Sequence, residues 1–392
     1  MTSTSITKNW EIQSSTGKHF DPLDGLRGIA ILMVVAHHAF YTNPASPLVV
    51  THAFHGLTRA GWIGVPLFFV LSGFLISYPF FCRRQTDPGF WNLKGYAARR
   101  LGKIVPPFYL SIVIFATYYF LRSHDPAYWG VALKWALGLS NFIQPSLEFN
   151  GSYWSLIVEA HFYVLLPLLF WLGRGLSSRH TAMGLFAVLF FVPLAARQLT
   201  WPAGTVDWPT NYFLMERFPC QLDYFAWGVL FSGLFVSVSA ARDELRGLGL
   251  LGYVGAALLA VSVGLFALWT NLFDIHIHPT RWSTEVFHVL PGISAFFLLF
   301  FVFDPGCLGS RLLAKWPLRF VGIVSYEWFL FHGPVIIIFR KMFGNAHGYL
   351  LTYASNSLLP AGLTFLLSAL LYHFFSRPIL NRIRGKRAAA TS

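Results

Sequence analysis

An arginine and a histidine near the start of the chain have the residue types and the spacing of a buried reaction site. Arg27 and His38 are eleven residues apart, and at about 100° per residue this is close to three turns of an α-helix, so both side chains share one face. The residues between them are apolar or small, apart from His37. A guanidinium can hold an anionic donor, and a neutral imidazole can move a proton. The pair therefore predicts a buried site on one face of an apolar helix, where a proton is transferred to or from a substrate.

Glu159 is the third candidate for chemistry. It lies about six residues inside an apolar segment that begins near Tyr153, and a buried carboxylate needs a partner. We interpret Glu159 as the group that orients His38 or the substrate. A structural ion pair or a helix-packing hydrogen bond is the alternative for Glu159, and a packed core histidine is the alternative for His38.

A basic segment supplies a second cationic position. Arg99, Arg100 and Lys103 lie where a helix is expected to start, and backbone N–H groups at such a position also favour anions. The alternative is the ordinary accumulation of basic residues on the cytoplasmic side of a membrane protein. With Arg27 on the same predicted side, two cationic positions suit a phosphate-rich donor such as coenzyme A.

Two further segments give weaker candidates. Ser72 lies in an apolar helix beside Gly73, where small residues usually allow close helix packing, although Ser72 could also line the path of the donor. His332 is equally interpretable as a structural residue or as a binder of the acceptor. Pro334 is expected to kink the helix just after His332.

The elements that must position these residues are membrane-spanning helices. Of the 392 residues, 55% are hydrophobic and 11% are charged, whereas a soluble domain is about a quarter charged. The chain is therefore predicted to be an all-α polytopic membrane protein with about ten transmembrane helices in one bundle. The net charge of +13 fits basic cytoplasmic loops, and no basic stripe interleaved with aromatic residues indicates nucleic-acid binding.

Ten apolar stretches have the length of about 20 residues that a span needs. They are 28–45, 62–81, 104–121, 153–172, 181–197, 221–239, 248–269, 285–303, 320–340 and 355–376. The less apolar stretch 128–144 is expected to be a short helix outside the bilayer or against it. Most of the 29 Lys and Arg residues fall on one side if both termini are cytoplasmic, which favours that orientation.

The remaining sequence features limit the other possibilities. We expect a cytoplasmic segment at 1–22 without a cleavable signal, a transmembrane domain at 23–377 and a basic cytoplasmic tail at 378–392. Three cysteines, which are Cys82, Cys220 and Cys307, are far apart and fall on different predicted sides. That distribution argues against a disulfide framework and a cysteine metal site, and no metal site of another kind is predicted.

Five motifs together resemble the acyltransferase-3 family of integral-membrane O-acyltransferases. They occur in the family's order along nearly the whole chain and are Asp24–Gly28 with Arg27 and His38, Phe68–Phe74, Arg99–Pro106, Trp154–Tyr163 and Ser325–His332. Two departures are Ala160-His161, where members often have Glu-Gln, and Glu327-Trp328, where Leu-Tyr is usual. These departures leave the expected core chemistry intact and bear on the identity of the acceptor.

The resemblance implies transfer of an acyl group, expected to be acetyl, from cytoplasmic acyl-CoA to a hydroxyl of a cell-surface glycan or a lipid-linked sugar. It implies a bacterial plasma-membrane protein, surrounded by lipid, with acyl-CoA as co-substrate and no tightly bound cofactor. His38 and Glu159 are then the expected catalytic residues. The expected donor-binding residues are Arg27, Arg99, Arg100, Lys103 and Ser72, and the expected acceptor-binding residues are Trp154, Tyr326 and His332.

Alternative functions remain open at this point. Acylation of a small secondary metabolite such as a macrolide is the alternative within the enzyme class. A proton-coupled transporter could use His38, Glu159 and His332 as a relay, but the sequence has neither the inverted repeats nor the paired broken helices common in transporters. A scaffold without chemistry would not need ionisable residues at mid-membrane. His38 could act as a general base or as a transient acyl carrier.

Overall fold

The computed structural model of the chain describes residues 20–41, 49–86, 93–143, 150–173, 176–200, 216–238, 244–273, 281–343 and 354–388. These ranges are almost entirely helical and contain no β-strand, which confirms the all-α prediction. The helices form two compact units: unit 1 comprises residues 1–90 and 164–323, and unit 2 comprises residues 91–163 and 324–392.

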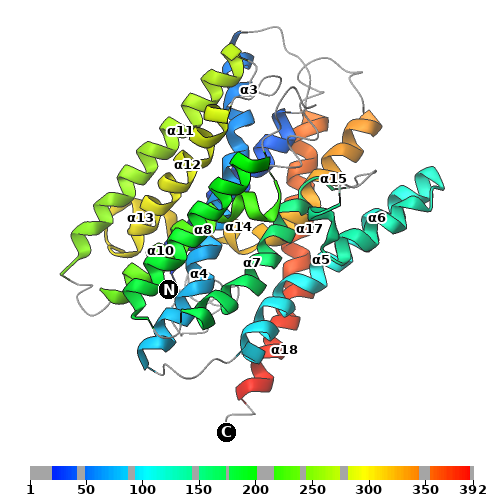
Figure 1. The fold of residues 1–392 in the computed structure, drawn as a ribbon. Helices are drawn as coiled ribbons and strands as arrows, with labels where there is room; N and C mark the ends of the chain where they lie inside the picture. The colour runs from blue at the N-terminus through cyan, green and yellow to red at the C-terminus, as the bar shows by residue number, and fades with distance from the viewer. Residues whose placement is uncertain are drawn as a thin grey trace, which may run out of the picture. The chain divides into compact units, whose positions relative to one another are not determined.

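Unit 1 contains most of the helices (Figure 1). They are α2 (Asp21–Ala36), η1 (His37–Tyr41), α3 (Val49–Arg59), η2 (Ala60–Ile63), α4 (Gly64–Thr86), α8 (Ser178–Thr200), α10 (Phe218–Ser237), η5 (Arg246–Leu250), α11 (Leu251–Phe273), α12 (Arg281–Leu298), η6 (Leu299–Val302), α13 (Leu308–Leu313) and α14 (Trp316–Ile323).

Unit 2 contains the remaining helices, and α7 (Tyr153–Leu172) begins in unit 2 and ends in unit 1. The others are α5 (Leu93–Ser123), α6 (Ala127–Ala136), η3 (Leu139–Asn141), α15 (Ser325–Phe343), η7 (Ala354–Leu358), α17 (Leu359–Leu371), η8 (Tyr372–Ser376) and α18 (Arg377–Ala388). The short helix α6 confirms the helix predicted within 128–144.

In the described residues, all ten predicted spans fall on helices; residues 42–45 of the first span and 239 of the sixth lie outside the described residues. Eight helices in the described ranges are long and apolar enough to cross a membrane, or nine if the bent pair α14 and α15 is one span. The long helix α10 is outside this set because polar residues such as Gln221 and Asp223 near its start lower its mean hydropathy. The chain is thus a polytopic membrane protein, with a span count close to the predicted one.

In unit 1, α4 packs against α10 with almost no side chain between the two backbones. A Cβ on Gly73 would collide with the Phe225 carbonyl oxygen, and a Cβ on Gly228 would collide with the Val70 carbonyl oxygen. Small residues permit this approach. Of the pair Ser72-Gly73, which was expected to allow close helix packing, Gly73 is the residue at the contact. The pairings Val70 with Gly228 and Phe81 with Gly233 make α4 and α10 parallel.

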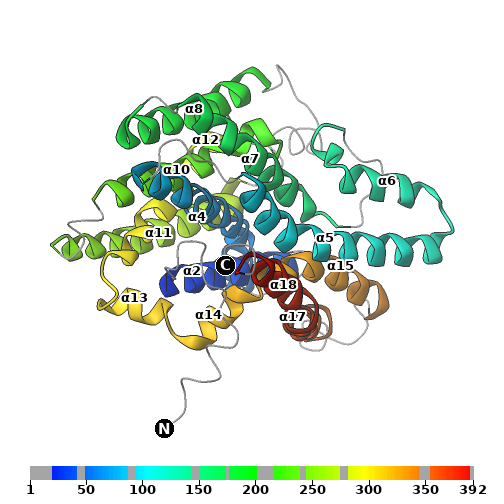
Figure 2. The same ribbon diagram turned by 90° about the horizontal axis from the view of Figure 1, so that it is seen from below.

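The first helix of unit 1, α2, runs antiparallel to α4. Gly64 at the start of α4 meets the Ala30 carbonyl oxygen, while the ring of Phe20, which precedes α2, lies 5.8 Å from the ring of Phe74. On another side, α2 packs against α13 and α14 (Figure 2). The end of α2 therefore lies at the same end of unit 1 as the starts of α4 and α10.

In unit 2, α5 and the first half of α7 run antiparallel. The Tyr153 hydroxyl donates to Ser111 Oγ over 2.7 Å, and the Tyr96 hydroxyl donates to the Tyr163 carbonyl oxygen over 3.0 Å. Helix α17 packs against α15, where the Trp328 indole N–H donates to Thr364 Oγ1 over 3.1 Å. These bonds join helices that are far apart in sequence.

Helix α15 continues through Pro334 without a break, and the kink expected there stays a prediction. The ninth predicted span, 320–340, is instead divided at Val324 into α14 and α15. Proline removes the N–H that would bond the carbonyl four residues before it, which is that of Leu330. Asn150 Nδ2 donates to this carbonyl oxygen over 2.8 Å. The substitute bond explains why the helix is not interrupted at Pro334.

Candidate active site

His38 lies in a short π-helical turn, η1, which follows α2 directly. Single π-helical turns within helices are frequent at functional sites. His38 Nδ1 lies 3.0 Å from the Val34 carbonyl oxygen, and because a carbonyl can only accept, Nδ1 must carry the hydrogen. The neutral ring then has its lone pair on Nε2, which is the state that a general base or an acyl-accepting nucleophile requires.

The neighbouring His37 has a different environment. Its Nδ1 lies 2.9 Å from the Arg59 carbonyl oxygen and 3.3 Å from that of Thr58. His37 therefore ties the end of α2 to the end of α3, and its contacts are those of a structural residue. This makes His37 a matched control for His38 in every experiment on the reaction.

Arg27 projects from a part of α2 that is fixed by backbone packing. A Cβ on Gly25 would collide with the Leu313 carbonyl oxygen, and a Cβ on Gly28 with that of Leu318. The glycines of the Asp-Gly-Leu-Arg-Gly motif thus seat α2 against α13 and α14 and fix the direction of Arg27. Half-buried Arg27 is about 16 Å along the helix from His38, at about 1.5 Å per residue.

Sequence reasoning missed a second arginine beside the start of α2. Arg319 of α14 is buried, and its Nη2 lies 3.0 Å from Asp21 Oδ1. The close approach of Gly322 to the Asp24 carbonyl oxygen holds α14 at this position. Arg319 adds a cation at the same end of unit 1 as Arg27. Its sequence setting, a basic loop before a predicted span, gave no sign of this contact.

The remaining unit 1 candidate is Ser72, which is half-buried on α4. The other predicted site residues belong to unit 2. Among these, Arg99 and Arg100 come together with Glu159. Both arginines and Glu159 act electrostatically on the Tyr96 hydroxyl, and the guanidinium of Arg100 lies over the Tyr163 ring at 5.5 Å. Glu159 is near enough to the Tyr163 hydroxyl, one turn along α7, to accept its hydrogen bond.

Lys103 and Tyr326 lie next to this group of charged residues in unit 2. Lys103 is half-buried one turn after the arginines, and the Tyr326 hydroxyl donates to the adjacent Ile104 carbonyl oxygen over 2.8 Å. Glu159 also acts electrostatically on Tyr326. The carboxylate of Glu159 thus belongs to the surroundings of the basic segment, and its predicted action on His38 stays a prediction.

The last two predicted acceptor-binding residues differ in exposure. Trp154 is half-buried in the first turn of α7. His332 is fully buried, at 0% exposure, and its Nδ1 lies 3.0 Å from the Trp328 carbonyl oxygen. His332 therefore has the same tautomer as His38, with the lone pair of the neutral ring on Nε2.

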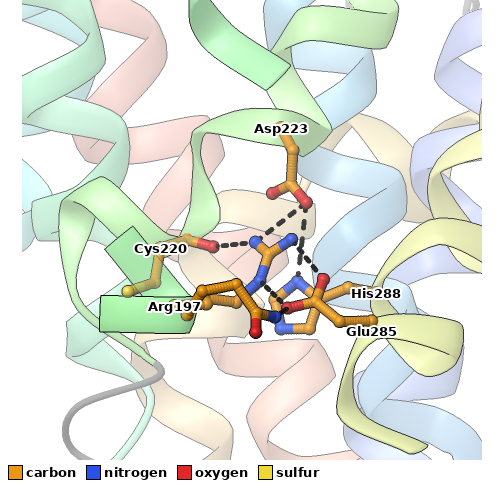
Figure 3. A network of polar contacts seen from close by, with 6 residues as sticks. Arg197, Cys220, Asp223, Glu285 and His288 are labelled. Carbon is orange, nitrogen blue, oxygen red and sulfur yellow. Dashed lines mark hydrogen bonds and ion pairs between the residues drawn. The ribbon is translucent and has the colours of Figure 1, made fainter. Parts of the chain in front are cut away.

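The most extensive buried polar network described in unit 1 was not predicted from the sequence. We call Arg197, Asp223, Glu285 and His288 the Arg197 cluster (Figure 3). Arg197 Nε and Nη2 donate to the two oxygens of Glu285, over 3.2 and 2.9 Å. Arg197 Nη1 donates to the Cys220 carbonyl oxygen over 2.6 Å and lies 2.9 Å from Asp223 Oδ2. The cluster joins the end of α8 to the starts of α10 and α12.

One sequence signal could have revealed the Arg197 cluster. Arg197, Asp223 and Glu285 all fall at ends of predicted spans that lie on the same predicted side of the membrane. Charged residues at span ends are usually solvated, but Arg197 and Asp223 are each only 2% exposed. The parallel packing of α4 and α10 places this cluster toward the end of unit 1 that also holds His38.

Comparison with known proteins identifies the family of the chain. The acyltransferase-3 family, described as an acyltransferase domain, matches residues 21–373. The chain is 23% identical to the O-acetyltransferase OatA of Staphylococcus aureus strain NCTC 8325 / PS 47, over 95% of this chain and 59% of that protein. It is 24% identical to a putative O-acetyltransferase of Staphylococcus aureus strain COL, over 92% of this chain and 57% of that protein.

The chain therefore spans about 59% of the length of OatA. No solved structure matches it. The family match covers nearly the whole transmembrane part, including the motifs around Arg27, His38, Arg99, Glu159 and His332. With its helical membrane fold and this match, the chain belongs to the acyltransferase-3 family and consists largely of that family's acyltransferase domain.

Proposed function

We propose that this protein transfers an acetyl group from acetyl-CoA to a hydroxyl of a cell-surface glycan or a lipid-linked sugar in the bacterial plasma membrane. Membership of the acyltransferase-3 family and similarity to proteins named O-acetyltransferase support the reaction class. The observation that carries the proposal is the position of His38 in a π-helical turn, with its Nδ1 hydrogen donated to Val34.

The proposed reaction needs one base and one fixed thioester. His38 Nε2 takes the proton of the acceptor hydroxyl, and the oxygen attacks the thioester carbonyl carbon. The new C–O bond forms, the C–S bond breaks, and the proton passes from His38 to the coenzyme A thiolate. If His38 instead carries the acetyl group, the same Nε2 attacks the thioester first and the coenzyme A thiolate leaves; the acceptor oxygen then displaces the imidazole from the acetyl carbon, and the acceptor proton passes to the thiolate. Both routes need the tautomer that the bond to Val34 favours.

The donor is proposed to bind through its phosphates. Arg27 and the segment with Arg99, Arg100 and Lys103 supply the cations, and guanidinium groups suit phosphate oxygens in particular. Glu159 would orient the arginine pair through Tyr163, in addition to its predicted role toward His38 or the acceptor. We propose Ser72 along the donor path, on the half-buried middle of α4.

The acceptor is proposed to meet Trp154, Tyr326 and His332. Trp154 and Tyr326 offer aromatic faces and polar tips, and buried His332 offers a second neutral imidazole. We also propose that both termini are cytoplasmic, so that the basic segments of α5 and α18 lie on the side where acyl-CoA is available.

The class of reaction is tested by mass spectrometry of glycans and lipids from cells supplied with isotopically labelled acetate. Cells with the wild-type protein or the His37→Gln variant should contain a labelled ester, and cells with His38→Gln should lack it at equal protein levels. Equal labelling with His38→Gln, or no ester with the wild type, would contradict the proposal.

A further inference from the structure

Several buried polar atoms in the Arg197 cluster and on the adjacent Tyr224 have no hydrogen-bond partner among the described residues. Asp223 Oδ1, the Tyr224 hydroxyl and His288 Nδ1 have none among the described residues, although Asp223 is 2% and Tyr224 1% exposed. His288 Nδ1 lies 3.8 Å from Asp223 Oδ2, which is too long for a hydrogen bond. Buried groups in this state destabilise a fold unless a ligand or an ordered water completes their hydrogen bonds.

These three atoms lie close together on neighbouring helices. Asp223 and Tyr224 are adjacent on α10, and the rings of Tyr224 and His288 stack with their centroids 5.1 Å apart. Glu285 is 16% exposed, so the cluster is open to the surroundings at the ends of α8, α10 and α12.

The charges restrict what the ligand can be. The hydrogens of Arg197 are engaged by Glu285, Asp223 and the Cys220 carbonyl, so the arginine is a poor anion site. One cation and two carboxylates give a formal charge of −1 while His288 is neutral, which disfavours a phosphate or a carboxylate. Asp223 Oδ1 accepts only, whereas Tyr224 donates and accepts. Neighbouring hydroxyl groups match this set.

We propose that Asp223, Tyr224 and His288 form a binding subsite for a sugar-like polyol, namely the hydroxyl-bearing acceptor. The inference rests on the proposed function for its identification of this ligand as the acceptor. The subsite lies toward the His38 end of unit 1, whereas Arg27, the proposed donor-binding residue, lies about 16 Å along α2 from His38. A neutral sugar and a glycolipid headgroup present the same hydroxyl chemistry.

Tyr224→Phe separates a binding role from a structural one. Removing an unsatisfied buried hydroxyl should leave the thermal unfolding midpoint unchanged or raise it. Losing a bond to the ligand should raise the half-saturating ligand concentration about tenfold or more. Tyr253→Phe is the matched control, because the Tyr253 hydroxyl accepts from the Gly309 N–H over 2.9 Å. That variant should lose some stability and keep the ligand response.

The experiment measures the unfolding midpoint of the full chain in nanodiscs of neutral lipid, without acyl-CoA. The probes are methyl glucoside, a glucosyl lipid, methyl glucosaminide and glucose 1-phosphate. The proposal predicts stabilisation of the wild type by the glucoside or the glucosyl lipid, weakened by Tyr224→Phe and by the second variant Asp223→Asn. A response to the glucoside indicates a soluble glycan, and a response to the glucosyl lipid alone indicates a lipid-linked sugar.

Several results would overturn the subsite. One such result is that neither methyl glucoside nor the glucosyl lipid stabilises the wild type. Another is that only methyl glucosaminide or only glucose 1-phosphate stabilises it. A third is that the response of both variants to the sugar equals that of the wild type. If Tyr224→Phe does not fold, the response of Asp223→Asn decides. Sugar binding without any acyl transfer would contradict only the proposed function, whereas acyl transfer with an unchanged sugar response in both variants would contradict only the subsite.

Discussion

Asn150 is predicted to hold two helices of unit 2 together, and its replacement by alanine is predicted to be costly. Its Nδ2 donates to the Leu330 carbonyl oxygen over 2.8 Å, and its Oδ1 accepts from the Ser152 N–H over 3.0 Å just before α7. Asn150 is 1% exposed. Asn150→Ala leaves the Leu330 carbonyl unsatisfied, at about 1–3 kcal/mol, and removes a second bond, at about 0.5–1.5 kcal/mol.

The expected total is therefore about 1.5–4.5 kcal/mol of unfolding free energy. The origin of the cost can be isolated in a double-mutant cycle with Pro334→Ala. Alanine at position 334 restores the N–H that a helix offers to Leu330, so Asn150→Ala should cost about 1–2 kcal/mol less in that background. A Cβ on Gly333 would lie 3.6 Å from Asn150 Oδ1, so the two helices meet closely here.

The measurement is SDS-induced unfolding of the purified protein in mixed micelles, with exposed Asn381→Ala of α18 as a control expected within about 0.5 kcal/mol of the wild type. The reasoning is refuted if Asn150→Ala, like the control, lowers the unfolding free energy by less than about 0.5 kcal/mol. It is also refuted if the effects of Asn150→Ala and Pro334→Ala on the unfolding free energy are additive within about 0.5 kcal/mol.

Three further predictions use the same preparations. Gly25→Ala should lower the unfolding free energy by at least about 1–3 kcal/mol, because the new Cβ would meet the Leu313 carbonyl oxygen. The control Gly264→Ala, where a Cβ has open space, should raise the unfolding free energy by up to about 1 kcal/mol. Equal effects of the two variants would contradict the close packing of α2 against α13. Arg197→Met should cost about 3–5 kcal/mol, since it leaves Asp223 and Glu285 buried without their cation, and a neutral result in the same titration would refute this. Arg27→Ala should raise the KM for acetyl-CoA about tenfold or more with little change in the KM for the acceptor, and steady-state kinetics that show the reverse would exclude the donor role.

The helical framework was predictable because apolar stretches of span length determine it. Within the described residues, all ten predicted ranges fall on helices, and the short helix α6 lies where a less apolar stretch suggested it. The division of the ninth span at Val324 was not predicted, and α15 continues through Pro334 because the freed carbonyl finds another donor. For Pro334 that donor comes from Asn150, 180 residues from Leu330 in sequence, and local patterns do not contain such pairings.

The candidate site was predictable where one helix positions the residues. Arg27 and His38 lie along one helical segment, although the π-helical turn at His38 has no periodicity signal. Arg99, Arg100 and Glu159 were recognised separately, but their proximity depends on the antiparallel packing of α5 and α7. The Arg197 cluster needs three helix ends to meet, and each of its charged residues alone resembles an ordinary span-end residue.

The central claim is that His38 performs the transfer chemistry while the adjacent His37 is structural. The most direct test compares kcat for transfer of labelled acetyl to the acceptor identified by mass spectrometry, at saturating acetyl-CoA and acceptor, for the wild type, His38→Gln and His37→Gln. A general base contributes about 10²–10⁴-fold, so kcat should fall by that factor in His38→Gln and stay close to the wild-type value in His37→Gln. Wild-type kcat in His38→Gln, or equal losses in both variants, would contradict the account.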